Sequence, residues 1–218
     1  MPEAVFFDLD GTLADTAPDL AGTLNRLQAE HGLAPSPFEQ LRPQVSNGVR
    51  GMLGVGFGLT PDEPAYAGLA QRFLSLYAEF LCVETRLFPG MTELLDQLDE
   101  RGITWGIVTN KAERLAKPLV EALGLAERSI CTIGGDTTAR AKPFPDPLLY
   151  ACRIAGIAPT SSLYIGDDIR DIVAGKAAGM RTVAAAYGYL GSHQPIDTWE
   201  ADTIIEHPLE ILHLLGKS

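Results

Sequence analysis

Apolar and polar residues alternate along the chain in blocks that predict helices and strands in turn. Apolar residues recur at helical spacing around 91–98, 112–123, 148–155, 169–178 and 209–215. The strand-length apolar runs are AVFFDL (4–9), TWGIVT (104–109), SICTIG (129–134), SLYIGD (162–167), RTVAAA (181–186) and TII (203–205). Strands that alternate with helices predict βαβ units. The expected fold is therefore α/β, with a doubly wound parallel sheet and helices on both faces.

One long segment does not follow this alternation, because residues 16–88 contain no convincing strand. Leu20, Leu24 and Leu27 lie on one helical face, and AYAGLAQRFLSLYAEFL (65–81) reads as a second helix. The Pro- and Gly-rich passage between them is too apolar for a disordered linker. An all-helical block between the first strand and its crossover helix predicts an inserted cap. We therefore divide the chain into a core domain, residues 1–15 and 89–218, and a helical cap domain, residues 16–88.

The charge of the chain narrows the choice of partners. It has 218 residues with 17 basic and 28 acidic side chains, a formal net charge of −11. Such a chain repels nucleic acid and anionic membranes, so we expect neither as a partner. No apolar run approaches the roughly 18 residues of a membrane span, and the N-terminus has no signal-peptide pattern. Three scattered cysteines favour a reducing compartment. We expect a cytoplasmic protein, either a monomer or a homodimer.

Acidic side chains stand where two buried strands of the predicted sheet end. Asp8 and Asp10 close the first strand, and Asp167 closes the strand at 162–167. Ligands of open α/β sheets bind beyond the carboxyl ends of the strands, so neighbouring strands would bring these acids into one crevice. Carboxylates that close together repel one another unless a cation lies between them. Oxygen ligands without nearby Cys or His suit Mg²⁺, which we expect as the cofactor.

The same crevice is expected to hold groups that bind an anion. Thr109 and Asn110 follow the strand at 104–109, with Lys111 next, and Lys142 stands before Pro143. A carboxylate can attack phosphorus while a metal and an ammonium group hold the phosphoryl charge. This combination suits a small-molecule phosphate ester as the partner. Lys111 itself we interpret as a solvated lysine rather than a substrate contact.

Four segments, in order, resemble the four motifs of the haloacid dehalogenase superfamily. They are DLDGT (8–12), VTN (108–110), KP (142–143) and GDDIRD (166–171). The resemblance implies a Rossmann-like core, and the helical insertion is similar to that superfamily's C1-type cap. Within it, the chain is similar to the phosphoglycolate phosphatase group. Stretches that look closest to the proteobacterial N-acetylmuramic acid 6-phosphate phosphatases are GIVTNKAER, YIGDDIRDIVAGKAAGM, AAYGYL and ADTIIEHPLEIL.

The resemblance implies a Mg²⁺-dependent phosphomonoester hydrolase with an aspartyl-phosphate intermediate. Asp8 would be the nucleophile and a metal ligand. Asp10 would protonate the leaving alkoxide, deprotonate the attacking water and coordinate Mg²⁺ through its backbone carbonyl. Asp167 would be the third protein ligand of Mg²⁺. The substrate implied is a metabolite phosphate with a carboxylate, such as N-acetylmuramic acid 6-phosphate.

The other motif residues would support this chemistry. Thr109 would hydrogen-bond the phosphoryl oxygens, aided by the Asn110 amide. Lys142 would neutralise the charge on the phosphate and the nucleophile. Asp168 and Asp171 are placed to orient metal-bound waters, although Asp171 also suits the first turn of a helix.

The cap is expected to select the substrate, because the core recognises only phosphate. Arg50 stands in what reads as the first turn of a helix, where it would reach a substrate carboxylate bidentately. The rival reading of Arg50 is an exposed helix arginine. Because 2-phosphoglycolate and N-acetylmuramic acid 6-phosphate both carry a carboxylate, Arg50 does not separate them. The core loop YGYLGSHQP (187–195) is expected to form part of the pocket wall.

Three alternatives to this function remain open. The first is a 2-phosphoglycolate phosphatase. The second is a β-phosphoglucomutase-type phosphomutase, which uses the same Asp8 and Asp10 but forms an isomer rather than inorganic phosphate. The third is a non-catalytic binding module on the same fold, which would be expected to lose Asp8, Asp10 or Lys142. A dehalogenase is disfavoured, because Asp10 stands where those enzymes lack the acid–base aspartate.

Overall fold

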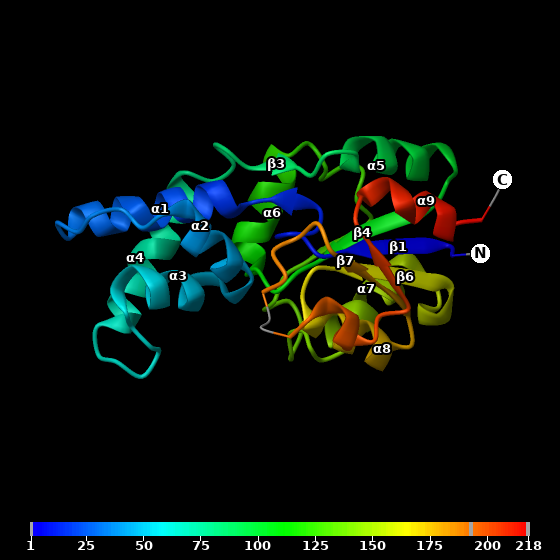
Figure 1. Ribbon diagram of the computed structural model, residues 1–218. Helices are drawn as coiled ribbons and strands as arrows, with labels where there is room; N and C mark the ends of the chain where they lie inside the picture. Colours follow the sequence, from blue (N-terminus) through cyan, green and yellow to red (C-terminus); the bar gives the residue numbers. More distant parts are fainter. Residues whose placement is uncertain (1, 192–193, 217–218) are drawn as a thin grey trace.

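Six parallel strands form the sheet at the centre of the protein (Figure 1). The computed structural model describes residues 2–191 and 194–216. In spatial order the strands are β5 (Thr132–Ile133), β4 (Thr104–Val108), β1 (Ala4–Phe7), β6 (Ser162–Gly166), β7 (Arg181–Ala185) and β8 (Thr203–Ile205). Every neighbouring pair is parallel. The predicted α/β fold with a parallel sheet is confirmed.

Helices cover both faces of this sheet. Successive residues of a strand point to opposite faces, so Val5 and Phe7 of β1 belong to one hydrophobic cluster, and Ala4 and Phe6 belong to another. The first cluster is completed by α5 (Met91–Glu100), α6 (Glu113–Ala122) and α9 (Ile211–Leu214), and the second by α7 (Asp146–Ala155) and α8 (Ile169–Ala178). The short 3-10 helices of the core are η2 (Pro159–Ser161), η3 (Ile196–Trp199) and η4 (Pro208–Glu210).

A helical insert lies beyond the carboxyl ends of the strands, at the left of Figure 1. Its elements are α1 (Ala17–Glu30), α2 (Phe38–Leu41), the 3-10 helix η1 (Arg42–Asn47), α3 (Gly48–Phe57) and α4 (Tyr66–Glu79). The insert has a hydrophobic cluster of its own, built around Leu24, Leu27, Met52 and Phe73, all of which are fully buried. The predicted insertion is confirmed. Its limits as a separate cap domain, residues 16–88, remain our proposal.

One prediction about the insert is wrong, because residues 16–88 do contain a strand. The strand β3 (Arg86–Leu87) pairs antiparallel with β2 (Ala14–Asp15). Two-residue strands are too short to show an alternating pattern, so the sequence gives no signal for them. Just beside this ribbon, the buried Asp19 carboxylate accepts hydrogen bonds from the Glu84 N–H (2.8 Å), the Thr85 N–H (2.9 Å) and the Thr85 hydroxyl (2.6 Å). The two chain crossings between core and cap are thus bonded to each other.

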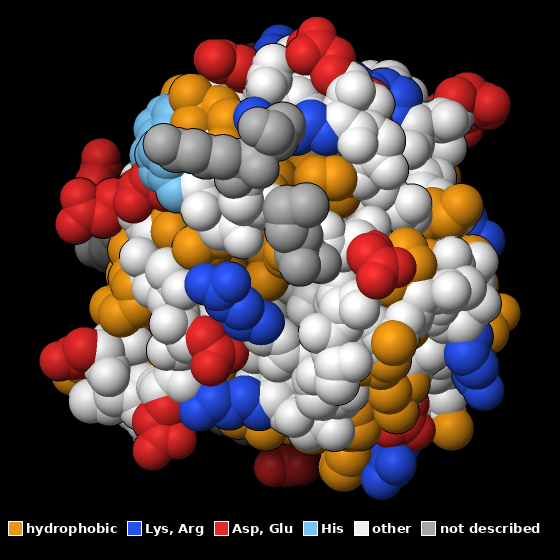
Figure 2. Space-filling model, turned by 90° about the vertical axis from the view of Figure 1, so that its right-hand side faces the viewer, with side chains coloured by type: hydrophobic (Ala, Val, Ile, Leu, Met, Phe, Trp, Pro, Cys, Tyr) orange, Lys and Arg blue, Asp and Glu red, His pale blue; other side chains and the backbone are white. Residues whose placement is uncertain are grey.

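The end of the core that faces away from the cap is seen in Figure 2. Acidic and basic side chains are interspersed on this face, with apolar groups scattered between them. Among the helices in the described part of the chain, none is long and apolar enough to cross a membrane.

Candidate active site

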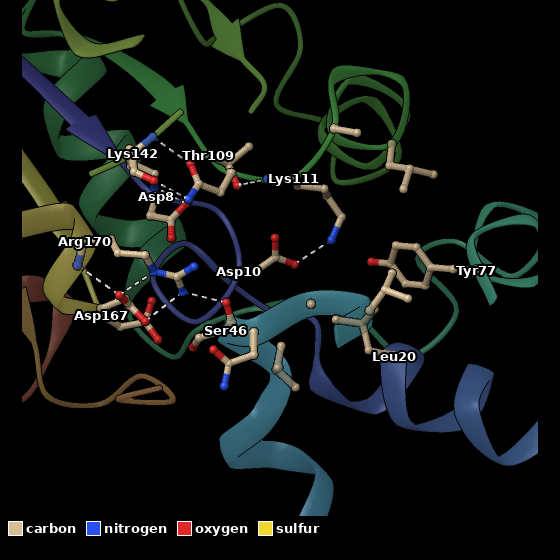
Figure 3. A pocket seen from close by; sticks show the side chains of 18 of the residues that line it. Asp8, Asp10, Leu20, Ser46, Tyr77, Thr109, Lys111, Lys142, Asp167 and Arg170 are labelled. Atoms are coloured by element: carbon tan, nitrogen blue, oxygen red, sulfur yellow. Dashed lines mark hydrogen bonds and ion pairs between the residues drawn. The ribbon is translucent and has the colours of Figure 1, made fainter. Parts of the chain in front are cut away.

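The strand register brings three sequence-predicted segments to one point. Phe7, the last residue of β1, lies opposite Ile107 of β4 and Ile165 of β6. The residues that follow these strands therefore meet at the carboxyl edge of the sheet. The strand order reverses at β1, where the crevice of an open α/β sheet binds ligands. A cavity of about 270 Å³ opens there between the sheet and the cap (Figure 3).

Three buried carboxylates converge at the bottom of this cavity. Asp8, Asp167 and Asp171 each offer one oxygen, and these oxygens lie within 4.8 Å of one another. Burial raises the pKa of Asp167 well above its ordinary value, and the charges of Asp8 and Asp171 raise it further. A divalent cation between the three groups would offset both effects. The donors are all hard oxygens in a buried pocket, so this set fits a cation such as Mg²⁺.

The residues of this cluster differ in part from the metal ligands that the sequence predicts. Asp171, expected only to orient metal-bound waters, contributes a carboxylate oxygen to the cluster. It lies at the N3 position of α8, where its carboxylate accepts a hydrogen bond from the Asp168 N–H at 3.1 Å. The first turn of the helix therefore directs Asp171 toward the sheet edge. The Asp10 side chain is not part of the cluster, and coordination through its backbone carbonyl stays a prediction.

The position of Asp167 is fixed by small neighbours. Gly11 has φ +85°, and a Cβ there would lie 2.2 Å from an Asp167 oxygen. A Cβ on Gly188 would also lie 2.2 Å from the Asp167 Cβ. The Thr12 hydroxyl and the Tyr189 N–H donate hydrogen bonds to the two carboxylate oxygens, at 3.0 and 2.8 Å. Any side chain at Gly11 or Gly188 would displace this carboxylate.

Lys142 lies at the centre of the site and is almost fully buried. Its ammonium group lies 2.9 Å from Asp8 and 2.7 Å from Asp171. It also donates to the Tyr164 hydroxyl at 2.8 Å and the Val108 carbonyl at 3.1 Å. Burial alone would lower the pKa of Lys142, but the carboxylates of Asp171 and Asp8 outweigh it and raise the pKa above its ordinary value. The ammonium group therefore stays charged.

Asn110 and Thr109 line the cavity on the β4 side. The Asn110 side chain donates to the Lys142 carbonyl at 2.9 Å and accepts from the Lys142 N–H at 3.0 Å. It thereby holds the loop that carries the lysine. The Thr109 hydroxyl accepts a hydrogen bond from the Lys111 N–H at 3.1 Å and is buried. Phosphate binding by Thr109 and by the Asn110 amide stays a prediction.

The interpretation of Lys111 as a solvated lysine is wrong. Its side chain is 8% exposed, and its ammonium group lies 2.7 Å from an Asp10 carboxylate oxygen. The Thr16 hydroxyl donates to the same oxygen at 2.6 Å. The Asp10 charge more than offsets the effect of burial and raises the pKa of Lys111 above its ordinary value. The lysine is buried because Tyr77 of α4 covers it, with the ring centre 4.7 Å from the ammonium nitrogen.

Arg50, expected to reach the substrate, is not brought into this cavity. Its side chain is exposed on α3, and it is not among the residues that line the cavity. The preceding residues of η1 line it instead, including Ser46. Helical periodicity indicates that α3 is a helix, but it does not fix which residue of the turn at Asn47 faces the core.

An arginine of the core does line the cavity. The Arg170 guanidinium contacts both carboxylate oxygens of Asp168, each at 2.8 Å, and donates to the Ser46 carbonyl at 2.6 Å. Figure 3 shows this bridge between α8 and the cap. The carboxylate of Asp168 is therefore engaged by Arg170 and by the N-terminus of α8. Its orientation of metal-bound waters stays a prediction.

The tyrosines of the 187–195 loop do not line the cavity. The Tyr187 hydroxyl donates to the Thr12 carbonyl at 3.1 Å. The Tyr189 hydroxyl accepts from the Thr16 N–H at 2.7 Å and donates to Asp15 at 2.7 Å. Both tyrosines therefore hold the turn that follows β1 in place through hydrogen bonds, without facing the cavity. Ser192 and His193 of this loop lie outside the described residues.

Comparison with known proteins agrees with this geometry. The family model described as haloacid dehalogenase-like hydrolase matches residues 5–185. The chain belongs to this family. It is 44% identical over 216 residues to the N-acetylmuramic acid 6-phosphate phosphatase of Pseudomonas aeruginosa, covering 99% of this chain and 96% of that one. It is 46% identical over 211 residues to a phosphoglycolate phosphatase of Xanthomonas campestris, covering 96% and 95%.

A solved structure of a similar protein has the same fold. The crystal structure of a predicted phosphoglycolate phosphatase from Haemophilus somnus superposes with a TM-score of 0.86 at 28% identity, covering 98% of each chain. The protein is thus a phosphatase of the haloacid dehalogenase-like hydrolase family.

Sequence reasoning missed three residues of the site. Tyr164 alternates with buried apolar residues in β6, so its pattern is that of a core residue, yet its hydroxyl contacts Lys142 and Asp171. Arg170 lies inside the motif GDDIRD, so its position in that motif could have identified it as a residue of the site. Tyr77 lies on the buried face of α4, and its pattern does not reveal that its hydroxyl reaches a cavity.

Proposed function

We propose that the protein is a Mg²⁺-dependent phosphomonoester hydrolase that forms an aspartyl-phosphate on Asp8, with N-acetylmuramic acid 6-phosphate as its substrate. One observation carries the proposal. The Asp8 carboxylate lies at the sheet's switch point, 2.9 Å from the Lys142 ammonium and within 4.8 Å of the clustered Asp167 and Asp171 oxygens. A carboxylate so placed can attack phosphorus while positive charge is available for the phosphoryl oxygens.

The reaction then has two steps. An Asp8 oxygen attacks phosphorus, the bond from phosphorus to the ester oxygen breaks, and Asp10 gives its proton to the leaving alkoxide. Asp10 next takes a proton from water, which attacks the aspartyl-phosphate and releases inorganic phosphate and free Asp8. Lys142 and Thr109 hold the phosphoryl oxygens in both steps. Asp8, Asp167 and the Asp10 backbone carbonyl would hold Mg²⁺, which would supply positive charge to stabilise the transition state.

Two observations support N-acetylmuramic acid 6-phosphate as the substrate. Proteins of that name from Pseudomonas aeruginosa and Pseudomonas putida are 44% and 41% identical to this chain over nearly its full length. The cavity also has an apolar wall from the cap and α6, formed by Leu20, Val45, Val49, Phe73, Leu74 and Leu115. This wall suits the methyl groups of an acetylated, lactylated sugar. A two-carbon acid would leave it unfilled.

One observation favours the alternative substrate, 2-phosphoglycolate. The Xanthomonas campestris relative, at 46% identity, has the name phosphoglycolate phosphatase. A panel of esters separates the two: N-acetylmuramic acid 6-phosphate, 2-phosphoglycolate and glucose phosphates, each assayed for phosphate release with Mg²⁺. The highest kcat/KM is expected for the muramic acid ester. Formation of an isomer without inorganic phosphate would instead indicate a phosphomutase.

Removal of the metal is expected to inactivate the enzyme. EDTA should abolish phosphate release, and excess Mg²⁺ should restore it, because the clustered carboxylates repel both one another and the phosphate without a cation. Ca²⁺ should bind without supporting turnover, since its looser coordination misplaces the nucleophile. The measurement is phosphate release before and after chelation. Full activity after thorough chelation, verified by elemental analysis, would contradict the metal site.

Metal affinity is expected to depend on pH. Burial, only partly opposed by the Lys142 charge, raises the pKa of Asp171 to about 7. Below that pH the carboxyl is protonated and neutral, and above it the group is ionised. An ionised Asp171, whose oxygen lies within 4.8 Å of those of Asp8 and Asp167, attracts Mg²⁺ to the site and a neutral one does not, so Mg²⁺ affinity should fall from pH 8 to pH 6.

Calorimetric titration of Mg²⁺ at pH 8, 7 and 6 measures this effect. Paired buffers with different ionisation enthalpies report the protons released on binding, which should increase toward pH 6. Equal affinities at pH 8 and pH 6, with no proton release, would show that the carboxylates are already ionised in the metal-free protein.

A further inference from the structure

Two buried hydroxyl groups stand out in the described part of the chain. The Ser46 and Tyr77 hydroxyls are its only buried side-chain nitrogen or oxygen atoms without a hydrogen-bond partner. Both residues line the active-site cavity, and both belong to the cap, Ser46 in η1 and Tyr77 in α4. Leaving a buried hydroxyl unpaired is unfavourable, so such groups are rare in folded proteins. Their location in one cavity suggests that a ligand supplies the partner.

Tyr77 provides the stronger case, because only 1% of the residue is exposed. Figure 3 shows its hydroxyl directed toward Asp10 and Lys111, at the end of the cavity away from Lys142. Burial raises the pKa of Tyr77 to about 12, so the group is a neutral hydroxyl near pH 7 and can donate a hydrogen bond. A phenylalanine would fill the same space without the unpaired oxygen.

Lys111 places a positive charge beside this hydroxyl. Its ammonium group has three hydrogens, and its hydrogen bond goes to Asp10. The nitrogen lies 4.7 Å from the Tyr77 ring centre, and its charge acts on the nearby hydroxyl as well. Both groups are donors and both line the cavity. Together they suit an acceptor oxygen of a ligand.

We propose that Tyr77 is a specificity-determining residue, whose hydroxyl donates a hydrogen bond to an oxygen on the organic part of the phosphate ester. The proposal rests on the proposed function, because it takes the phosphoryl group to lie at Asp8 and Lys142. The organic part then extends toward the cap, where Tyr77 and Ser46 lie. Ser46, at the bridge to Arg170, is placed to bind a second substrate oxygen.

The test compares kcat/KM of the wild type and Tyr77→Phe for two esters. N-acetylmuramic acid 6-phosphate has several oxygens on its organic part, whereas phenyl phosphate has none beyond the ester oxygen. The variant should lose roughly 5- to 100-fold for the sugar ester and less than about twofold for phenyl phosphate, as expected for one buried hydrogen bond. Because phenylalanine keeps the ring, packing in the cap is preserved.

One control variant and two further esters sharpen the result. Tyr66→Phe lies on the same helix but outside the cavity, so it should not change the ratio between the two esters. N-acetylglucosamine 6-phosphate lacks the lactyl carboxylate, and 2-phosphoglycolate lacks the sugar. An effect retained with N-acetylglucosamine 6-phosphate assigns the contact to a sugar or acetyl oxygen. An effect seen only with the two carboxylate esters assigns it to the carboxylate.

Stability and binding separate this proposal from a structural role and from the proposed function. Tyr77→Phe should melt at the same or a higher temperature without substrate, because it removes an unpaired buried hydroxyl; a clear decrease would overturn the proposal. Equal kcat/KM losses for both esters, or none, would also overturn it. If the wild type hydrolyses no ester, the proposed function fails.

In that case calorimetry with N-acetylmuramic acid 6-phosphate tests the Tyr77 contact by itself. The Tyr77→Phe variant must then bind this ester more weakly than the Tyr66→Phe variant does. Ser46→Ala should show the same selective loss.

Discussion

Asp8→Asn is expected to abolish phosphate release, with kcat at least about 10⁴-fold lower. An amide is not nucleophilic toward phosphorus, and it offers no negative charge to a metal. The variant should fold, because removing one of three close carboxylates reduces their mutual repulsion. Substrate should still bind through Lys142 and the cap. The measurement is a single-turnover assay with Mg²⁺, together with mass spectrometry to detect any phosphorylated wild-type enzyme.

Two controls make this result decisive. Asp62→Asn, an exposed position in the cap, should retain full activity. Mass spectrometry of the Asp8→Asn protein must show that the amide has not deamidated during purification. Activity above about 1% of wild type in undeamidated protein would show that Asp8 is not the nucleophile.

Lys142→Met is expected to damage both chemistry and stability. The ammonium group is the partner of Asp8 and Asp171, and its loss leaves buried carboxylates without a positive charge. Breaking a buried ion pair by removing one partner typically costs about 3–5 kcal/mol of unfolding free energy. The rate should fall by about 10²–10³-fold, because one of the groups that stabilise the phosphoryl charge is lost.

The loss of stability in Lys142→Met is expected to be smaller when Mg²⁺ is bound. Excess Mg²⁺ should restore part of it, since a cation among the carboxylates replaces some of the missing charge. The measurement is the unfolding free energy in EDTA and in saturating Mg²⁺. Lys117→Met serves as the control, because that side chain is 59% exposed and pairs with Glu113 on its own helix. A loss as small as that of the control, in both conditions, would mean that Lys142 is not the structural counterion of the site.

Most of the architecture follows from local patterns in the sequence. The continuous apolar run before Asp8 predicts a strand buried on both faces, and β1 is one, with all four residues buried. Its acidic end, together with that of β6, places Asp8 and Asp167 in one crevice, because parallel strands end at the same edge. The capping residues of α8 fix where that helix begins, and it spans Ile169–Ala178 as expected.

The parts that could not be predicted depend on packing between distant segments. Lys111 looks solvated in the sequence because lysine usually is, and only the docking of α4 buries it against Asp10. Arg50 and Ser46 stand four residues apart, and the turn at Gly48 decides which of them faces the core. Asp171 reads equally as a helix-terminal acid or a site residue. Its contact with Lys142, 29 residues away in the sequence, is a property of the assembled sheet edge.

The two bonded crossings between core and cap also bear on how this family diversifies. The ribbon of β2 and β3 and the Asp19 contacts hold the insert at its base. Exposed positions farther out in the insert, such as Asp62, can therefore change without disturbing the carboxylates on the core. Two relatives of similar identity to this chain, 44% and 46%, bear two different substrate names, as expected if residues of the insert select the substrate.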